Sequence, residues 1–176
     1  MSEVIEFEDT VLKEDKVKMG SLYHSAAQAN LTGLLLNDER FTVFVELSLD
    51  TSQVELSQFG VKTKQELQSD VCVYVEPPIE PQPPDDVLRV SQMPVLTIEI
   101  LSPEQKMSDI FAKFKAYFAL GIKSCWLVIP SLTQISVYSN PNQHKTFDLN
   151  NTEVIDEIMD IRLPIQKVFK RILKKS

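Results

Sequence analysis

The segment from residue 94 to residue 130 constrains the fold more than any other part of the chain. It begins with PVLTIEILS at 94–102, a nearly continuous apolar run of the kind that is buried on both faces of a sheet. A second such run is SCWLVIP at 124–130, and residues 104–120 between them place apolar side chains at helical spacing. A strand, a helix and a strand in this order form a right-handed crossover with neighbouring parallel strands. The sequence therefore predicts an α/β domain.

Further helices and strands are predicted on both sides of this unit. Ser21 after Gly20 is a suitable N-cap for the first helix, and Pro164 can open the last one. β-branched and aromatic residues mark the additional strands. The predicted elements are helices at 21–36 and 164–174, and strands at 41–49, 70–75, 134–139 and 145–150. Together they give a mixed β-sheet flanked by helices.

The longest irregular segment is an acidic, proline-rich loop at residues 76–86. Its five prolines exclude a helix interior and a central strand, so a surface connector is expected. The chain has 176 residues and no internal repeat, which is enough for one domain with a substantial core. We therefore expect a single domain over residues 1–176.

Composition indicates the compartment. No apolar run is long enough to cross a bilayer, and the acidic N-terminus has no apolar signal core. Cys72 and Cys125 lie inside strand-like segments, where buried free thiols in a reducing compartment are expected. With two histidines in the chain, a His-rich transition-metal site is not expected. These features predict a cytoplasmic protein without a membrane partner.

Two carboxylates occur on strands that are otherwise apolar. Glu99 lies in the middle of the run at 94–102, where an ionised carboxylate must be paired, hydrogen-bonded or bound to a metal. Asp70 begins the strand at 70–75, although Asp is also common at strand starts for its turn chemistry. Carboxylates from adjacent strands can hold Mg²⁺ or Mn²⁺, which prefer oxygen ligands. Such a metal polarises a phosphate and lowers the pKa of a bound water.

The helix that follows Glu99 carries three polar residues on one face. Asp109, Lys113 and Tyr117 recur at intervals of four. Lys113 could reach back to the two carboxylates and orient or activate an attacking water. The alternative is an exposed Asp109–Lys113 pair, with Tyr117 covering the edge of the core. Spacing alone favours this alternative.

A family resemblance alters that weighting. Five segments, in this order along the chain, resemble the signature of the Uma2 family of restriction-endonuclease-like proteins, which is abundant in cyanobacteria: Met-x-Ser-x-x-His at 19–24, DVCVY at 70–74, EILSP at 99–103, DIFAKFKAY at 109–117 and GIKSCWLVIP at 121–130. The resemblance covers roughly residues 19–140. Each piece is weak alone, but five in the right order are fairly specific.

The resemblance implies a fold, a cofactor and site residues. The family is placed in the PD-(D/E)XK nuclease superfamily, which implies a divalent metal and phosphodiester hydrolysis. Asp70 and Glu99 would be the metal ligands, and Lys113 would be a catalytic lysine that has moved onto the helix. His24 would line the site from the first helix or act as a cap or core residue. Ser102 would bond a phosphate or, as we prefer, cap the helix that begins after it.

The chain departs from the family pattern at four positions. Leu101 stands where the superfamily has its lysine, two residues after the second acid. Ser69 replaces the proline expected before Asp70, and Cys125 stands where an aromatic residue is usual. Ile129 occupies a position that is often Asp. These departures weaken the inference of activity, but they leave the three proposed catalytic residues in place.

The leading functional hypothesis is a Mg²⁺-dependent endodeoxyribonuclease, a hydrolase that acts on DNA as a homodimer. The net charge of −7 argues against it, because DNA-binding surfaces present an excess of Lys and Arg. Two alternatives remain open. One is a catalytically degenerate binding or assembly module, and the other is a hydrolase of small phosphoesters.

Overall fold

The computed structural model describes residues 21–62, 66–79 and 81–173. Met19 of the sequence pattern and the predicted end of the last helix at residue 174 lie outside the described residues. In chain order the elements are α2 (Leu22–Leu36), β1 (Thr42–Val45), β2 (Ser48–Asp50), the 3₁₀ turn η1 (Leu56–Phe59), β3 (Glu66–Gln68), β4 (Val71–Tyr74), β5 (Leu96–Ile100), α3 (Met107–Ala119), β6 (Ser124–Ile129), the 3₁₀ turn η2 (Pro130–Leu132), β7 (Gln134–Asn140), β8 (Gln143–Phe147), β9 (Glu153–Asp156), β10 (Ile161–Pro164) and α4 (Ile165–Val168).

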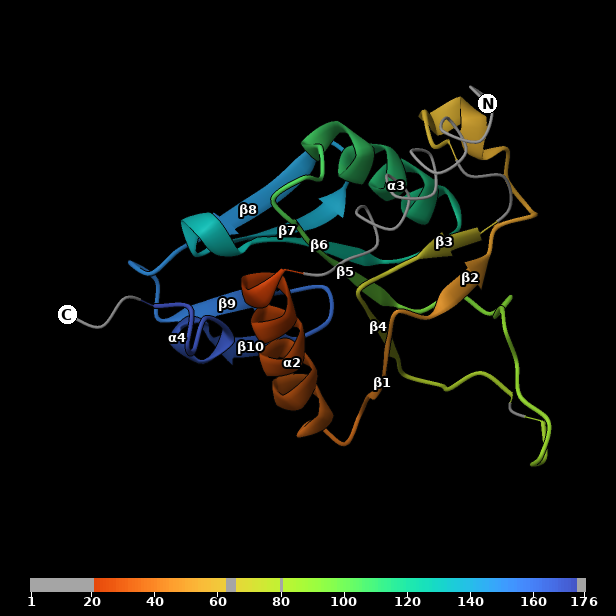
Figure 1. The fold of residues 1–176 in the computed structure, drawn as a ribbon, viewed down its shortest axis with the longest axis horizontal. Helices are drawn as coiled ribbons and strands as arrows, with labels where there is room; N and C mark the ends of the chain where they lie inside the picture. The colour runs from red at the N-terminus through yellow and green to blue at the C-terminus, as the bar shows by residue number, and fades with distance from the viewer. Residues whose placement is uncertain (1–20, 63–65, 80, 174–176) are drawn as a thin grey trace, which may run out of the picture.

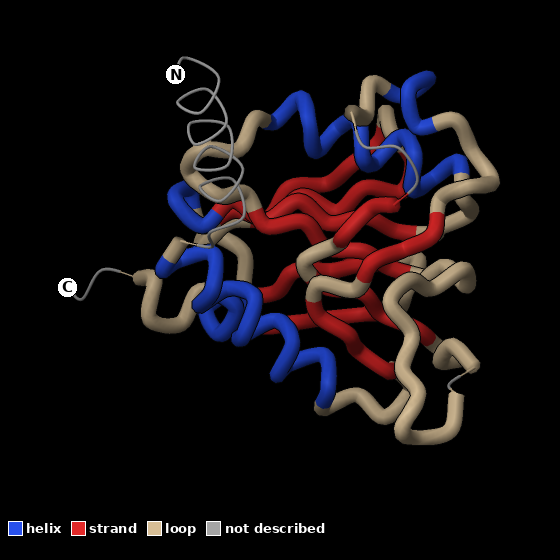
Figure 2. The backbone as a smooth tube through the Cα atoms, turned by 45° about the vertical axis from the view of Figure 1, so that its right-hand side comes forward, coloured by secondary structure: helices blue, strands red, loops and turns tan. Residues whose placement is uncertain are grey.

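A six-stranded mixed sheet forms the centre of the molecule. Its strand order is β1-β4-β5-β6-β7-β8. β5 and β6 are parallel, as the strand–helix–strand unit predicts, and the other neighbours in the sheet are antiparallel. Helices α2 and α4 cover one face and α3 covers the other (Figures 1 and 2). The predicted mixed α/β sheet flanked by helices is therefore confirmed.

Strand β5 is buried on both faces, which explains its continuous apolar pattern. Leu96, Ile98 and Ile100 pack in the core beneath α2 and α4. The alternate residues Thr97 and Glu99 point to the α3 side, because successive side chains of a strand point to opposite faces. Glu99 is 2% exposed, so this carboxylate lies inside the α3 core.

Helix α2 begins where the sequence predicts. Ser21 is its N-cap, and the Ser21 hydroxyl accepts a hydrogen bond from the backbone N–H of His24 at 3.2 Å. Helix α3 begins later than predicted, at Met107, with Lys106 as its N-cap. Residues 102–105 instead form a turn closed by the Gln105 N–H and the Ser102 carbonyl at 3.1 Å. Pro103 occupies the second position of this turn, where its fixed φ is favourable. The predicted capping role of Ser102 is therefore wrong.

Two further predictions are corrected. The predicted strand at 41–49 is split into β1 and β2 because Glu46 adopts a left-handed φ of 52°. β2 then leaves the large sheet and pairs with β3. The predicted helix from 164 is also shorter, since Pro164 ends β10 and α4 stops at Val168.

The β9–β10 hairpin was not predicted, and a buried aspartate anchors it to the sheet. Asp156 is 1% exposed and accepts hydrogen bonds through both carboxylate oxygens. Oδ2 accepts from the Ser124 hydroxyl and from the Trp126 indole N–H at 2.8 Å. Oδ1 accepts the backbone N–H groups of Ile158 and Met159 at 3.0 and 3.1 Å. These hydrogen bonds satisfy the Asp156 carboxylate, which therefore has a structural role in the fold.

The connector between β4 and β5 extends from the body of the molecule (Figure 1). Residues 76–79 and 81–86 contain no helix or strand. The connector returns to the small sheet through Val90, which bridges Leu49. Among the described residues, no helix is long and apolar enough to cross a membrane.

Candidate active site

Asp70 and Glu99 stand side by side at one end of two paired strands. β4 and β5 are antiparallel, with Val71 opposite Ile98. Continuing that register by one step places Asp70 opposite Glu99. Adjacent strands lie about 4.8 Å apart, so the two carboxylates share one end of the sheet. The Asp70 carboxylate also accepts the backbone N–H of Ile100, the residue after Glu99, at 2.6 Å.

Glu99 receives two side-chain donors from α3. The Tyr117 hydroxyl donates to Oε1 at 2.7 Å, and the Lys113 ammonium lies 3.0 Å from the same oxygen. Burial raises the pKa of Glu99 to about 7, and the nearby charge of Asp70 adds to the rise. Lys113 and the Tyr117 hydrogen bond oppose this rise because they favour the charged form.

His24 approaches Asp70 from the opposite layer of the fold. It lies in the first turn of α2, and its Nε2 is 3.1 Å from Asp70 Oδ1. The His24 side chain is 10% exposed and the Asp70 side chain 19%. The hydrogen bond to Asp70 raises the pKa of His24 above its ordinary value despite the opposing effect of burial. The charged imidazolium is thus favoured beside the carboxylate.

The Lys113 ammonium has two partners in the structure. Besides Glu99, its ammonium donates to the backbone carbonyl of Gln68 at 2.8 Å. The predicted helix face is therefore divided: Lys113 and Tyr117 turn inward to Glu99, whereas Asp109 is exposed. No hydrogen bond or ion pair joins the Asp109 side chain to another of the residues that the structure describes. The alternative of an Asp109–Lys113 surface pair is not what the structure contains.

The backbone around Asp70 is held by residues that sequence patterns did not single out. Gln28, one turn after His24, donates its side-chain amide to the Asp70 carbonyl at 2.9 Å. The same carbonyl accepts the N–H of Glu46 at 3.2 Å, which is the contact made by the left-handed residue between β1 and β2. Ser69 is buried and donates to the carbonyls of Val71 and Ile98 at 2.9 and 3.2 Å. The serine that replaces the expected proline therefore pairs its hydroxyl within the sheet.

Comparison with known proteins shows the family to which this fold belongs. A family model described as "Uma2: Putative restriction endonuclease" matches residues 14–166. The chain belongs to the Uma2 family. The resemblance seen in the sequence is therefore confirmed.

A solved structure shares the Uma2 fold of this chain. It is a crystal structure of a protein from Anabaena variabilis ATCC 29413, described as a putative nuclease belonging to DUF820. The two chains are 20% identical, with a TM-score of 0.69 over 88% of this chain and 84% of the other. At this identity the likeness concerns the fold. No curated protein matches the chain.

The donor atoms of this Uma2 site fit a hard cation that keeps part of its water shell. Within the described part of the chain, no group of three or more His, Cys, Asp and Glu side chains is arranged to hold a metal ion. Mg²⁺ and Mn²⁺ do not need such a cage, because one or two carboxylates together with waters and substrate oxygens complete their shell. Asp70 and Glu99 supply such a pair.

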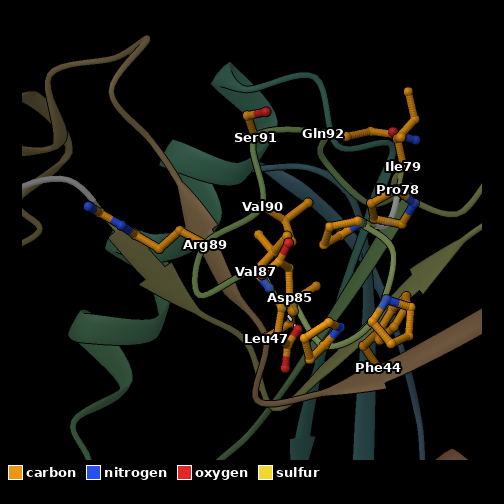
Figure 3. Close-up of a pocket in the computed structure, with 14 residues that line it drawn as sticks. Phe44, Leu47, Pro78, Ile79, Asp85, Val87, Arg89, Val90, Ser91 and Gln92 are labelled. Atoms are coloured by element: carbon orange, nitrogen blue, oxygen red, sulfur yellow. Dashed lines mark hydrogen bonds between the residues drawn. The ribbon is translucent and has the colours of Figure 1, made fainter.

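A separate hollow of about 590 Å³ lies between the connector and β1 (Figure 3). It is lined by Phe44, Leu47 and the connector residues 78–79, 81, 83–87 and 89–92. Prolines and aliphatic side chains make up most of its wall. The charged residues of the wall are Asp85, Asp86 and Arg89. None of the predicted site residues lines this hollow, so it is distinct from the carboxylate pair.

Proposed function

We propose that this Uma2 protein is a metal-dependent endonuclease that hydrolyses phosphodiester bonds in DNA. The observation that carries the proposal is the pair of carboxylates on adjacent strands, with the Lys113 ammonium 3.0 Å from one of them. Clusters that combine a carboxylate of perturbed pKa, such as Glu99, with a nearby cation are typical of catalytic sites. The family description supports the same class of reaction.

Asp70 and Glu99 would hold Mg²⁺ or Mn²⁺. When bound, the cation would polarise the scissile phosphate and lower the pKa of a water nucleophile. His24 and the Ile100 N–H hold the Asp70 carboxylate in place through one oxygen each. They contribute orientation, because a fixed ligand does not need to reorganise during the reaction.

Lys113 provides the positive charge of the site. Its ammonium has three N–H donors, and the Glu99 carboxylate and the Gln68 carbonyl account for two partners. The third donor remains for the attacking water or for the negative charge that develops on the phosphate. This role replaces that of the superfamily lysine, whose position is taken by Leu101.

We further propose that the protein acts in the cytoplasm as a homodimer. Cys72 and Cys125 are both free and buried, as predicted, which is consistent with a reducing compartment. A homodimer would present two sites to the two strands of a duplex. Size-exclusion chromatography with light scattering tests the dimer, and a monomer at all concentrations would contradict it.

Cleavage of supercoiled plasmid DNA in Mg²⁺ or Mn²⁺ tests the proposed reaction. We expect nicked and linear products that disappear with EDTA. Glu99→Gln and Asp70→Asn should lower the rate by at least about 100-fold, because each removes a ligand charge. Asp109→Asn is the matched control, since Asp109 is exposed on the same helix as Lys113, and it should retain the wild-type rate. A wild-type protein inactive on both duplex and single-stranded DNA would contradict the proposal.

A second candidate, a hydrolase of small phosphoesters, is favoured by the net charge of −7. Repulsion by the DNA backbone matters less for a small substrate than for a duplex. Hydrolysis of bis(p-nitrophenyl) phosphate without plasmid cleavage would favour this candidate. The absence of both activities, and of metal binding, would favour a degenerate binding module.

A further inference from the structure

Tyr117 lies entirely within the α3 core and contacts one side of the candidate site. Its side chain is fully buried, and its hydroxyl donates to Glu99 Oε1 at 2.7 Å. Its ring packs near Phe114, with ring centroids 6.5 Å apart. Tyr117 therefore does not face solvent or substrate, and any influence on chemistry must act through Glu99.

The two oxygens of Glu99 have unequal surroundings. Oε1 is contacted by both Tyr117 and Lys113. Oε2 has no hydrogen-bond donor among the described residues. Oε2 is thus the oxygen of Glu99 that remains available to a further ligand.

We propose that Tyr117 is a positioning residue for metal binding, because it anchors Oε1 of Glu99 and leaves Oε2 for the cation. This inference rests on the proposed metal-dependent function. The terminal torsion of a glutamate is broad and nearly two-fold, so an unanchored carboxylate exchanges its oxygens freely. Two donors on one oxygen remove that freedom before the ion arrives. The cation then does not have to order the ligand, which increases its affinity.

Lys113 alone does not provide this anchor. Its ammonium sits on a flexible four-carbon stem and is shared with the Gln68 carbonyl. Tyr117 is rigid by comparison, because its ring is packed on all sides and only its hydroxyl rotates. The two residues lie four apart on α3, so the helix delivers both donors to one oxygen.

Tyr117→Phe removes the hydroxyl and keeps the ring. We expect Mn²⁺ binding, measured by calorimetry on the full chain, to weaken by about tenfold or more, which is the usual effect of losing a partner of a ligand. Tyr74→Phe is the matched control. Tyr74 is also buried, and its hydroxyl donates to the Gln92 carbonyl at 2.9 Å, away from the carboxylates. Its loss should leave Mn²⁺ affinity unchanged.

A spectroscopic readout separates positioning from a packing defect. Mn²⁺ bound at Glu99 changes the charge beside the Tyr117 phenol, so titration should give an ultraviolet difference spectrum of tyrosine. The signal should be present in the wild type and in Tyr74→Phe, and absent in Tyr117→Phe and Glu99→Gln. This measurement on the wild type stands even if a variant fails to fold.

The outcomes separate this inference from the proposed function. Mn²⁺ binding by the wild type, equal affinity in Tyr117→Phe and no tyrosine signal would overturn the role of Tyr117 alone. Wild-type protein that binds no Mn²⁺ would overturn both proposals. Weakened binding in Tyr117→Phe together with a tyrosine signal in the wild type would establish the positioning role.

Discussion

Glu99 remains on an apolar strand although burial raises its pKa to about 7. A carboxylate in such a place destabilises the fold unless its charge is compensated, and Lys113 and Tyr117 compensate it only in part. The strand would be more stable with a neutral residue at this position. This stability cost is the one that the proposed role of Glu99 as an anionic metal ligand would require.

The raised pKa of Glu99 predicts a pH-dependent difference between the wild type and Glu99→Gln without metal. A carboxyl group with a folded-state pKa above its unfolded value of 4.5 stabilises the fold in its protonated form, and that stability is lost as pH rises toward 7. Glutamine does not titrate. In EDTA, the free energy of unfolding of Glu99→Gln relative to the wild type should therefore be higher at pH 8 than at pH 4.5, by up to about 3 kcal/mol. Thermal unfolding at the two pH values measures this difference.

His24 also has a raised pKa, so its contribution to stability is present below its ordinary value of 6.5 and is lost as pH rises through the raised pKa. It is present in both proteins, and most of its effect is common to them, because the charge of Glu99 is the smallest of the causes that raise the pKa of His24. Equal differences in melting temperature at the two pH values would show that Glu99 is ionised without cost, contrary to the argument from burial.

At the scale of elements, the parts predicted from the sequence are those whose local pattern and tertiary burial agree. β5, β6 and the body of α3 have long apolar patterns, and Ser21 is a cap whose hydrogen bond forms as expected. The small sheet and the β9–β10 hairpin escaped prediction because their strands are three or four residues long and half exposed. Their stability comes from contacts distant in sequence.

The candidate site, too, was predictable only where the sequence carries a local pattern. Asp70, Glu99 and Lys113 could be named from residue type, spacing and family resemblance. The structure brings their side chains to one end of the sheet, but it excludes Ser102 as a helix cap and leaves Asp109 exposed. Gln28 and the carbonyl of Gln68 carried no sequence signal, because backbone acceptors and side-chain amides contribute no periodic pattern.

The anchoring of the β9–β10 hairpin by Asp156 can be tested by substitution. Asp156→Asn should destabilise the protein by about 2–4 kcal/mol, because an amide group would meet the Ser124 and Trp126 donors with a donor of its own. Urea unfolding measures this loss. Asp160→Asn is the control, since its side chain is 91% exposed, it pairs weakly with Arg40 at 3.8 Å, and Asn tolerates its left-handed φ. Similar losses in the two variants would contradict the anchoring role of Asp156.

At the scale of the whole molecule, an acidic chain carries a compact site between two layers. α2 supplies His24 from one face of the sheet and α3 supplies Lys113 and Tyr117 from the other, so both helices must be packed for the site to exist. The fold and the Uma2 family were predictable because five short motifs retain their order. The substrate depends on surface shape and charge, which those motifs do not encode.

Burial in the α3 core also predicts the behaviour of the two cysteines. Burial raises the pKa of Cys72 to about 12 and raises that of Cys125 as well. The thiolate is the reactive form, so both thiols should resist Ellman's reagent at pH 8 in the folded protein and react together on unfolding. Rapid modification of either thiol under native conditions would indicate that the sheet opens far more readily than its packing implies.

Calorimetric titration with Mn²⁺ tests the central claim most directly, using the wild type, Asp70→Asn, Glu99→Gln and the exposed control Asp109→Asn. The arrangement of the two carboxylates predicts one site in the wild type, loss of binding in the first two variants and full binding in the control. Absence of binding in the wild type, or binding that survives either carboxylate substitution, would contradict a metal site shared by Asp70 and Glu99.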